Sequence, residues 1–213
     1  MLKYLRYLIS PITIIVALYI FSFGRYYPTI FIIAFSLYMV LGDRYLCDDL
    51  STHKYSYPSV LNLILYLNLP ILMFFILIVI LVLGNNSSIG LIAILDNYLS
   101  INFISIKESF TIIDKIVMID LAALFIAIMG TNVGHELTHR KRNKVDMFVG
   151  NWLLALSWDC AFAIEHVYGH HKNVCLSGDP ATAKRGENIY HFILRAFVKE
   201  QKDAWKIEIN HLK

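Results

Sequence analysis

The residues of this sequence that could do chemistry are histidines gathered in two short segments. The first segment, GHELTHR, covers residues 134–140, and the second, EHVYGHH, covers residues 165–171. Neutral imidazole is a good ligand for iron, zinc or copper, so the two segments together predict a metal site. The candidate metal ligands are His135, His139, His166, His170 and His171.

The spacing within each segment matches one face of an α-helix. Residues i and i+4 share a face, so His135 and His139 form one pair of ligands. By the same rule His166 and His170 form a second pair. His171 is turned about 100° further round, given 3.6 residues per turn. It could complete the first metal site or reach a second one.

Each segment also has a glutamate beside its first histidine. Glu136 follows His135, and Glu165 precedes His166. A metal-bound imidazole needs a partner that orients its other ring nitrogen, and carboxylates are common partners of this kind. We therefore take Glu136 and Glu165 as the candidate catalytic residues, either as such partners or as metal ligands themselves.

The first segment also matches the H-E-x-x-H pattern of zinc peptidases. A catalytic zinc ion uses three protein ligands and keeps one position open. The second segment offers three further histidines, which are too many for one tetrahedral ion. The first segment also does not extend into the longer H-E-x-x-H-x-x-G-x-x-H form. A two-metal histidine-rich centre is therefore favoured over a peptidase.

The rest of the chain is too apolar for an ordinary soluble domain. Of its 213 residues 57% are hydrophobic and 16% charged, and the mean hydropathy is +0.57, which indicates a membrane protein. The net charge is only +3, and no basic stretch interleaved with aromatic residues suggests nucleic acid as a partner. The three cysteines have no C-x-x-C spacing, so neither a disulfide framework nor a thiolate metal site is expected.

Four apolar runs are long enough to cross a bilayer, which takes about 20 helical residues. We therefore expect an all-α fold: a multi-pass transmembrane helical bundle with a histidine-rich helical region at its cytoplasmic face. With four crossings and a cytoplasmic N-terminus, most Lys and Arg residues fall in the inside segments, as the positive-inside rule requires. The four runs cover roughly residues 7–23, 26–41, 61–83 and 112–129.

Residues 89–106 are apolar but interrupted by Asp96 and Asn97. Unpaired charge at the centre of a bilayer is costly, so we expect this segment at the membrane interface. A fifth crossing here would also place the basic cluster at residues 140–144 outside. Four crossings are therefore favoured.

The expected organisation has two parts. Residues 1–133 form the transmembrane helices, and residues 134–213 form a metal-binding region at the cytoplasmic face. Residues 147–164 are a further apolar stretch, interrupted by polar residues. If this stretch spanned the membrane, it would separate the two histidine segments, so whether it spans depends on whether the histidines act together.

The histidine segments and the residues that follow them resemble a known group of proteins. GHELTHR, EHVYGHH, the D-P-A of residues 179–181 and the G-E of residues 186–187 are similar to motifs of the integral-membrane alkane 1-monooxygenases and xylene monooxygenases. These enzymes belong to the membrane fatty-acid desaturase/hydroxylase superfamily. The D-P-A and G-E continuation, more than the histidines, is typical of the hydroxylase branch.

The resemblance implies a non-haem diiron centre, with two iron ions held by the five histidines. Such an enzyme inserts one oxygen atom of O2 into a C–H bond of an alkane or alkyl group. It implies electrons from a rubredoxin or a ferredoxin-type donor, an apolar substrate drawn from the bilayer, and contact with membrane lipid. The implied location is the cell inner (plasma) membrane, with the histidine segments on the cytoplasmic side.

The sequence departs from this pattern after the second segment. Members of the family are longer and have a third histidine box and an H-Y-G-type element downstream, whereas neither His191 nor His211 lies in a matching box. We therefore expect the N-terminal half of such an enzyme, truncated before the third box. Two alternatives stay open: an acyl-lipid desaturase or hydroxylase, and a catalytically silent truncated membrane protein.

Overall fold

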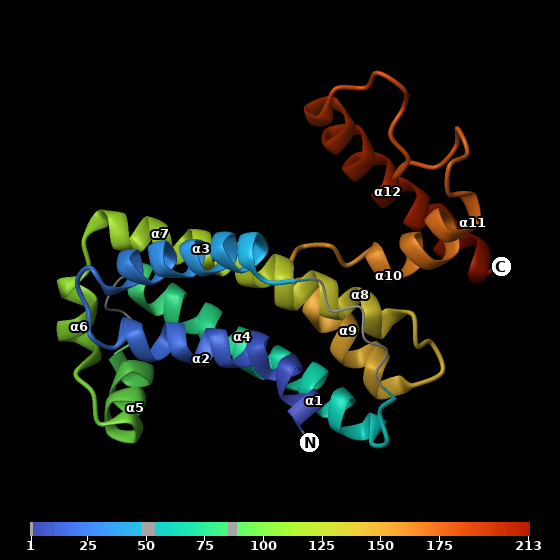
Figure 1. The fold of residues 1–213 in the computed structure, drawn as a ribbon. Coiled ribbons are helices and arrows are strands. Elements are labelled where there is room, and N and C mark those ends of the chain that lie inside the picture. The colour runs from blue at the N-terminus through green and yellow to red at the C-terminus, as the bar shows by residue number, and fades with distance from the viewer. Residues whose placement is uncertain (1, 48–53, 85–88) are drawn as a thin grey trace. The chain divides into compact units, whose positions relative to one another are not determined.

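The structure of the chain is a computed structural model that describes residues 2–47, 54–84 and 89–213. The described residues form helices and no strand, so the predicted all-α fold is confirmed (Figure 1). The chain divides into two compact units, Met1–Met129 and Gly130–Lys213. We call them unit 1 and unit 2 and describe each by itself.

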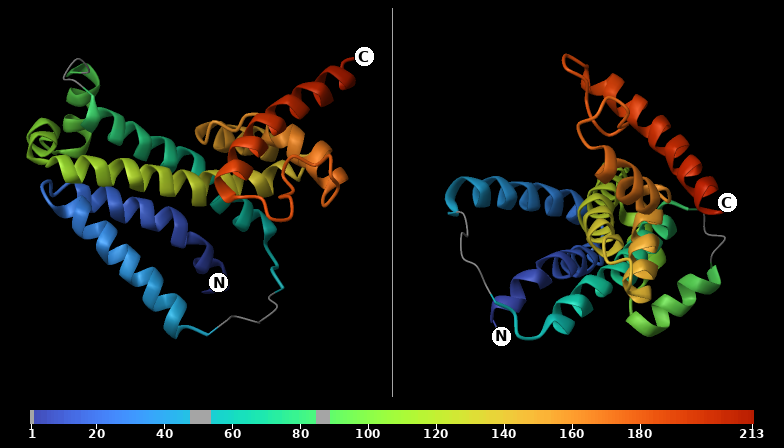
Figure 2. Two further views of the ribbon diagram at one scale, coloured as in Figure 1. Left: turned by 90° about the horizontal axis from the view of Figure 1, so that it is seen from above. Right: turned by 90° about the vertical axis from the view of Figure 1, so that its right-hand side faces the viewer.

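Unit 1 is built mainly from four helices. Its apolar runs fold as helices because a helix satisfies the backbone polar groups within the segment itself. Helix α2 packs against α3 and α4, and α7 packs against α3 and α4 as well (Figures 1 and 2). The four helices are α2 (Ile9–Phe21), α3 (Tyr27–Tyr45), α4 (Pro58–Leu83) and α7 (Ile112–Phe125). The short elements are α1 (Leu2–Leu5), η1 (Arg6–Leu8), α5 (Ile89–Leu99) and α6 (Phe103–Ser109).

The core of unit 1 is aromatic. Phe75 of α4 is fully buried, and its ring centroid lies 5.1 Å from that of Phe125 and 5.8 Å from that of Phe21. Tilted and edge-on ring contacts stabilise a core beyond simple apolar burial. These three rings therefore hold α2, α4 and α7 together.

Among the described residues of unit 1, two helical segments are long and apolar enough to cross a membrane. They are Lys3–Phe21, with a mean hydropathy of 1.7, and Pro58–Leu83, with a mean hydropathy of 2.8. They coincide with the first and third of the four predicted runs. The second and fourth runs are helical in α3 and α7, but both helices include charged residues. The count of four crossings stays a prediction.

The segment expected at the membrane interface is not one continuous helix. It forms α5 and α6, with a break at Ser100, whose backbone has a φ of 53°. The Asp96 carboxylate accepts a hydrogen bond from the Phe103 amide at 2.9 Å and so ties the two short helices together. Because of this break, no helix between residues 89 and 109 has the length of a membrane span.

Unit 2 contains both histidine segments, on short helices. Helices α8 and α9 form a helical hairpin, and α12 packs against α10 and η4 (Figure 1). The first histidine segment begins in α8 and ends just after it, and the second occupies η4 and the start of α11. The elements are α8 (Asn132–Thr138), α9 (Lys144–Leu156), α10 (Phe162–Ile164), η4 (Glu165–His170), α11 (His171–Asn173) and α12 (Ile189–His211).

Two glycines let α8 and α9 approach each other closely. A Cβ atom at Gly134 would lie 2.9 Å from Leu154 Cγ and 3.0 Å from the carbonyl oxygen of Gly150. A Cβ atom at Gly150 would lie 3.0 Å from Thr138 Cγ2. Larger side chains here would push the two helices apart, so the glycines fix where the first histidine segment lies.

Candidate metal centre

The structure brings the two histidine segments together. One ring nitrogen from each of four histidines, two per segment, lies within 4.8 Å of the others. We call this group the four-histidine cluster. Its members are His135, His139, His166 and His171. Both predicted segments therefore contribute side chains to one cluster.

The distances within the cluster suit a metal ion. The Nε2 atoms of His135 and His166 are 2.9 Å apart, and those of His166 and His171 are 3.1 Å apart. Metal–imidazole bonds are about 2.0–2.1 Å long, so two ligands at right angles around one ion have nitrogens about 3 Å apart. The donor set of imidazoles matches what iron, zinc and copper prefer, so the residues fit a transition-metal ion.

The winding of the second segment decides which of its histidines join the cluster. Element η4 is a π-helix, in which the hydrogen bonds run from i to i+5 and each turn takes more residues than in an α-helix. His166 and His171, five positions apart, therefore come to one side, with ring centroids 4.5 Å apart. The α-helical spacing predicted instead that His170 pairs with His166, because a π-helix cannot be recognised from spacing alone.

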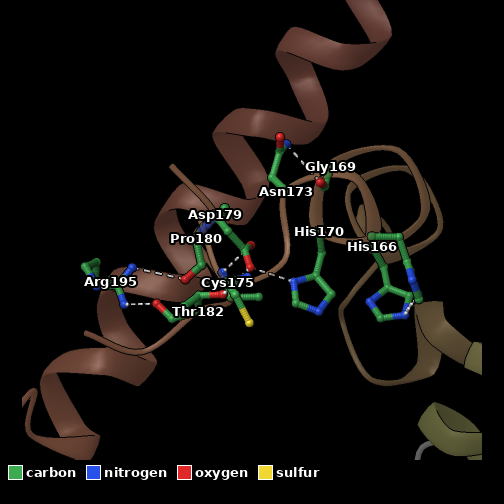
Figure 3. Close-up of polar contacts among 11 residues, drawn as sticks. His166, Gly169, His170, Asn173, Cys175, Asp179, Pro180, Thr182 and Arg195 are labelled. Atoms are coloured by element: carbon green, nitrogen blue, oxygen red, sulfur yellow. Dashed lines mark hydrogen bonds and ion pairs between the residues drawn. The ribbon is translucent and has the colours of Figure 1, made fainter. Parts of the chain in front are cut away.

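His170 stacks beside the cluster and binds a different partner. Its ring centroid lies 5.4 Å from that of His166, but its Nδ1 atom makes a 2.9 Å hydrogen bond with Oδ2 of Asp179 (Figure 3). The Asp179 carboxylate is buried and also accepts from the Ala181 amide at 3.0 Å and from the Thr182 hydroxyl. With Nδ1 engaged, the Nε2 atom of His170 is the one left to bind a metal.

The electrostatic surroundings keep the cluster in its metal-binding form. Burial, and then the proximity of His135 and His171, lower the pKa of His166 to about 4. Burial, and then the same two neighbours, also lower the pKa of His139. At neutral pH both imidazoles are uncharged, which is the form that coordinates a metal ion. The ring of Phe162 stacks on that of His166 at 4.4 Å between centroids and restricts its rotation.

The two candidate glutamates lie in different surroundings. Glu136 forms an ion pair with Arg140 at 3.0 Å, its side chain is more than half exposed, and it is not part of the four-histidine cluster. Glu165 is buried, and its Oε1 atom has no hydrogen-bond partner among the described residues. Burial, and then the nearby Glu200 and Asp179, raise the pKa of Glu165 to about 7. Glu165 also lines a cavity beside the histidines.

That cavity is acidic and has a volume of about 230 Å3. Three carboxylates and two imidazoles face it, and its lining includes no Lys or Arg side chain among the described residues. A pocket of this kind favours protons or a cation over an anion. The residues that line it are Asp159, Ala161, Phe162, Glu165, His166, His170, Ala181 and Glu200.

Sequence reasoning gave no role to several residues that support the site. Asp179 belongs to the D-P-A motif, which was recognised only as a match to other proteins. Its bond to His170 depends on how the loop folds back, and no periodicity in the sequence indicates that. Phe162 lies in an apolar stretch, where its contact with His166 cannot be distinguished from ordinary core packing.

The described residues of this apolar chain are helical and contain no strand, and its histidines lie in two clusters, as in the histidine-box proteins that the sequence resembles. Residues 116–212 match the Fatty acid desaturase family. The chain is 37% identical over 98 residues to an alkane 1-monooxygenase of Pseudomonas putida, a match that covers 46% of this chain and 24% of that protein. It is 40% identical over 84 residues to alkane 1-monooxygenase 1 of Alcanivorax borkumensis, covering 39% of this chain and 20% of that protein.

A further match runs over almost the whole chain. It is 30% identical over 209 residues to the xylene/toluene monooxygenase hydroxylase component of Pseudomonas putida, covering 98% of this chain and 51% of that protein. The chain therefore spans about half the length of this relative, and its matches cover a quarter or less of the alkane monooxygenases named above. These matches confirm the predicted resemblance: residues 116–212 are similar to the fatty acid desaturase family, and the chain is similar to alkane and xylene monooxygenases.

Proposed function

We propose that the chain is part of a membrane-bound non-haem diiron monooxygenase that oxidises a C–H bond of an alkane or alkyl group. The observation that carries this proposal is the four-histidine cluster, assembled from the same two segments that resemble the family motifs. The names of the relatives, alkane 1-monooxygenase and xylene/toluene monooxygenase hydroxylase component, support the substrate class.

The histidines divide into two sets that suit two iron ions. The four-histidine cluster would hold one ion. The Nε2 atom of His170, which lines the acidic cavity, would contribute to a second. Bound iron would supply dioxygen activation, with one oxygen atom going to the substrate and the other leaving as water.

The residues around the iron ions would have separate tasks. Asp179 orients His170 through its bond to Nδ1, and Phe162 restricts the ring of His166. Reduction of one oxygen atom to water consumes protons. Because the pKa of Glu165 is about 7, its carboxyl group can both hold a proton and release it near neutral pH. We assign Glu165 this proton-transfer role, and Glu136 the role of an ion-pair partner for Arg140 at the edge of the site.

An apolar cavity in unit 1 suits an apolar ligand. It has a volume of about 650 Å3 and lies between α2, α4 and residues 99–110. Its walls are mostly aliphatic and aromatic side chains, including Leu18, Phe74 and Ile78. A volume in this range accommodates a small hydrophobic molecule, so the cavity supports an alkyl compound, rather than a polar one, as the ligand of this chain.

The membrane arrangement and the electron donor complete the proposal. Residues 1–133 would form four crossings of the plasma membrane, with an interfacial segment near residues 89–106, and residues 134–213 would lie at its cytoplasmic face. The basic loop of Arg140, Lys141 and Arg142 would then meet an acidic rubredoxin or a ferredoxin-type donor.

A second candidate is a desaturase or hydroxylase acting on acyl lipids. It is favoured by the family match itself, whose description is fatty acid desaturase. The two candidates differ in product: an alcohol from an alkane, or a double bond or hydroxyl group on an acyl chain.

The test is product analysis together with iron content. Membranes that contain the protein would be supplied with octane, NADH, a rubredoxin and its reductase, and the products separated by gas chromatography. We expect 1-octanol from the wild type and none from His139→Ala. Desaturated acyl chains without octanol would support the second candidate. Well under one iron per purified chain would show a catalytically silent protein instead.

A further inference from the structure

The loop that carries Asp179 is held by a single arginine. Arg195 of α12 donates from Nε and Nη2 to the two carboxylate oxygens of Glu187, at 2.6 and 2.7 Å. The same guanidinium donates from Nη1 to the carbonyl oxygen of Pro180 and from Nη2 to that of Thr182, both at 3.0 Å (Figure 3). A guanidinium presents its donors in a rigid plane, so these four bonds fix the loop in one orientation.

This loop in turn fixes the position of the Asp179 carboxylate. Pro180 and Thr182 are held by Arg195, and Asp179 directly precedes them. The Thr182 hydroxyl donates to Asp179 Oδ2 and also accepts from the Cys175 amide at 3.0 Å. The Asp179 side chain is fully buried, so it has no freedom to turn toward solvent.

Asp179 in turn orients the imidazole ring of His170. Oδ2 of Asp179 lies 2.9 Å from Nδ1 of His170, and an ionised carboxylate can only accept, so the ring proton is on Nδ1. This tautomer leaves the lone pair on Nε2, which is the atom that a metal ion requires. A carboxylate that holds the far nitrogen of a metal-binding imidazole also increases the basicity of the ligand.

We propose that Arg195 and Asp179 are positioning residues for His170: they act through the loop to fix its tautomer and the direction of Nε2. The inference rests on the proposed function for one point only, namely that His170 is a metal ligand. Its structural part, the fixed tautomer, holds for the metal-free chain and can be tested without any metal.

The first experiment measures the tautomer directly. The full chain, labelled with 15N-histidine and purified in detergent micelles without metal, is examined by two-dimensional 1H–15N NMR at pH 8, with His170→Gln identifying the signal. We expect the wild type to have the proton of His170 on Nδ1. In Asp179→Ala the signal should change to one with the proton largely on Nε2. An unchanged tautomer in Asp179→Ala would overturn the proposal.

The second experiment tests Arg195 against a matched control. Arg195→Lys keeps the charge but removes the planar set of donors, whereas Arg185→Lys makes the same change at an exposed position of the same loop. We expect the His170 signal to broaden or split in Arg195→Lys and to stay unchanged in Arg185→Lys. Circular dichroism of both variants checks that they are folded. Equal spectra for the two variants would remove Arg195 from the proposal.

The third experiment asks whether the effect reaches the metal through His170. Co2+ binding is followed by its visible absorption in the wild type, Asp179→Ala, His170→Gln and the double variant. Loss of a residue that orients a metal ligand weakens metal binding by about 10- to 100-fold, and we expect this for Asp179→Ala. In the His170→Gln background, Asp179→Ala should cause no further loss of Co2+ affinity.

The outcomes distinguish the positioning role of Asp179 from the proposed metal function. Additive losses in the double variant would show that Asp179 acts on the fold in general, and would overturn its role as a positioning residue. A wild-type chain that binds no Co2+ at all would count against the proposed metal function. The NMR result would still decide whether Arg195 and Asp179 fix the tautomer of His170.

Discussion

The Nε2 atoms of His135 and His166 lie 2.9 Å apart, although the two residues are 31 positions apart in the sequence. Two imidazole nitrogens at this distance either share one proton or bind one metal ion. Their neighbours are further imidazoles, and burial followed by these neighbours lowers the pKa of His166 to about 4. The arrangement therefore favours coordination of a metal ion over protonation of the His166 imidazole.

Removing His166 should abolish metal binding at the cluster. The Nε2 atom of His166 lies within hydrogen-bonding distance of one histidine of each segment, at 2.9 Å from that of His135 and 3.1 Å from that of His171. We expect His166→Ala to lose most of its bound iron, measured by mass spectrometry of the purified protein. His191→Ala is the control, because His191 is exposed, lies outside the four-histidine cluster and bonds to Glu187 at 2.9 Å. Full iron content in His166→Ala would contradict the assignment.

The close contact between α8 and α9 should not tolerate a methyl group. In Gly134→Ala the new Cβ would lie 2.9 Å from Leu154 Cγ, so one of the helices must shift. Overpacking of this kind costs about 1–3 kcal/mol, of which the better helix propensity of alanine recovers up to about 1 kcal/mol. We expect a lower apparent Tm in detergent and weaker Co2+ binding.

The matched control for this variant is Gly178→Ala. A Cβ atom at Gly178 would have no heavy atom within 4 Å, so the same chemical change should leave Tm and metal binding unaltered. If Gly134→Ala bound Co2+ like the wild type, the glycine contact would have no part in positioning the first histidine segment.

The stability of the metal-free chain should depend on pH through Glu165. Burial raises the pKa of this carboxyl group from 4.5 to about 7, so the folded state binds its proton more tightly than the unfolded state. Its contribution to stability is therefore complete below about pH 4.5 and is lost as the pH rises through about 7. Glu165→Gln has no proton to lose at this position. We expect the amount by which its Tm exceeds that of the wild type to grow from pH 5 to about pH 7 and then to level off.

The difference between the two proteins is the quantity to measure, because His166 acts in the opposite direction. Its pKa is lowered from 6.5 to about 4, so its contribution to stability is lost as the pH falls through this range. Subtracting the two Tm curves cancels that effect. A Tm difference that stays constant from pH 5 to pH 8 would mean that the pKa of Glu165 is not raised.

Charge reversal on the basic loop should slow electron delivery. Arg142 is exposed and lies in the loop between α8 and α9, and an acidic donor would be attracted to it at low ionic strength. We expect Arg142→Glu to lower the rate of NADH consumption with rubredoxin at low salt, and the deficit to shrink at high salt. Arg185→Glu changes the charge equally on the other loop. Equal effects of the two variants would point to net charge, not to a docking surface.

Several features of the fold and site could be predicted from the sequence because they depend on local patterns. Apolar runs of span length specify helices whatever surrounds them, so the all-α fold follows from residues such as those of α4. The polar interruption at Asp96 predicted an interfacial segment in place of a span. The two short helices α5 and α6 agree with the absence of a span, while the interfacial position stays a prediction. Histidines at ligand spacing predicted that two segments would meet, and the four-histidine cluster contains both.

Other features depend on contacts between distant residues and leave no local pattern. The π-helix that brings His171 to His166 is not encoded in the spacing of polar residues. The bond of Asp179 to His170 needs a loop to fold back, and the sequence gave no role to Arg195, which holds that loop. The different surroundings of Glu136 and Glu165 arise from packing, since both stand beside a histidine in the sequence.

The π-helix at Glu165–His170 makes the pairing of histidines in the second segment depend on how the backbone is wound. If the same residues were wound as an α-helix, His170 and not His171 would share a face with His166, although the sequence would be unchanged. Deleting one residue between them, such as Val167, would leave His166 and His171 four positions apart, so a regular α-helix would then keep this pair together. Searches that accept only i and i+4 pairs overlook sites that a π-helix builds from i and i+5.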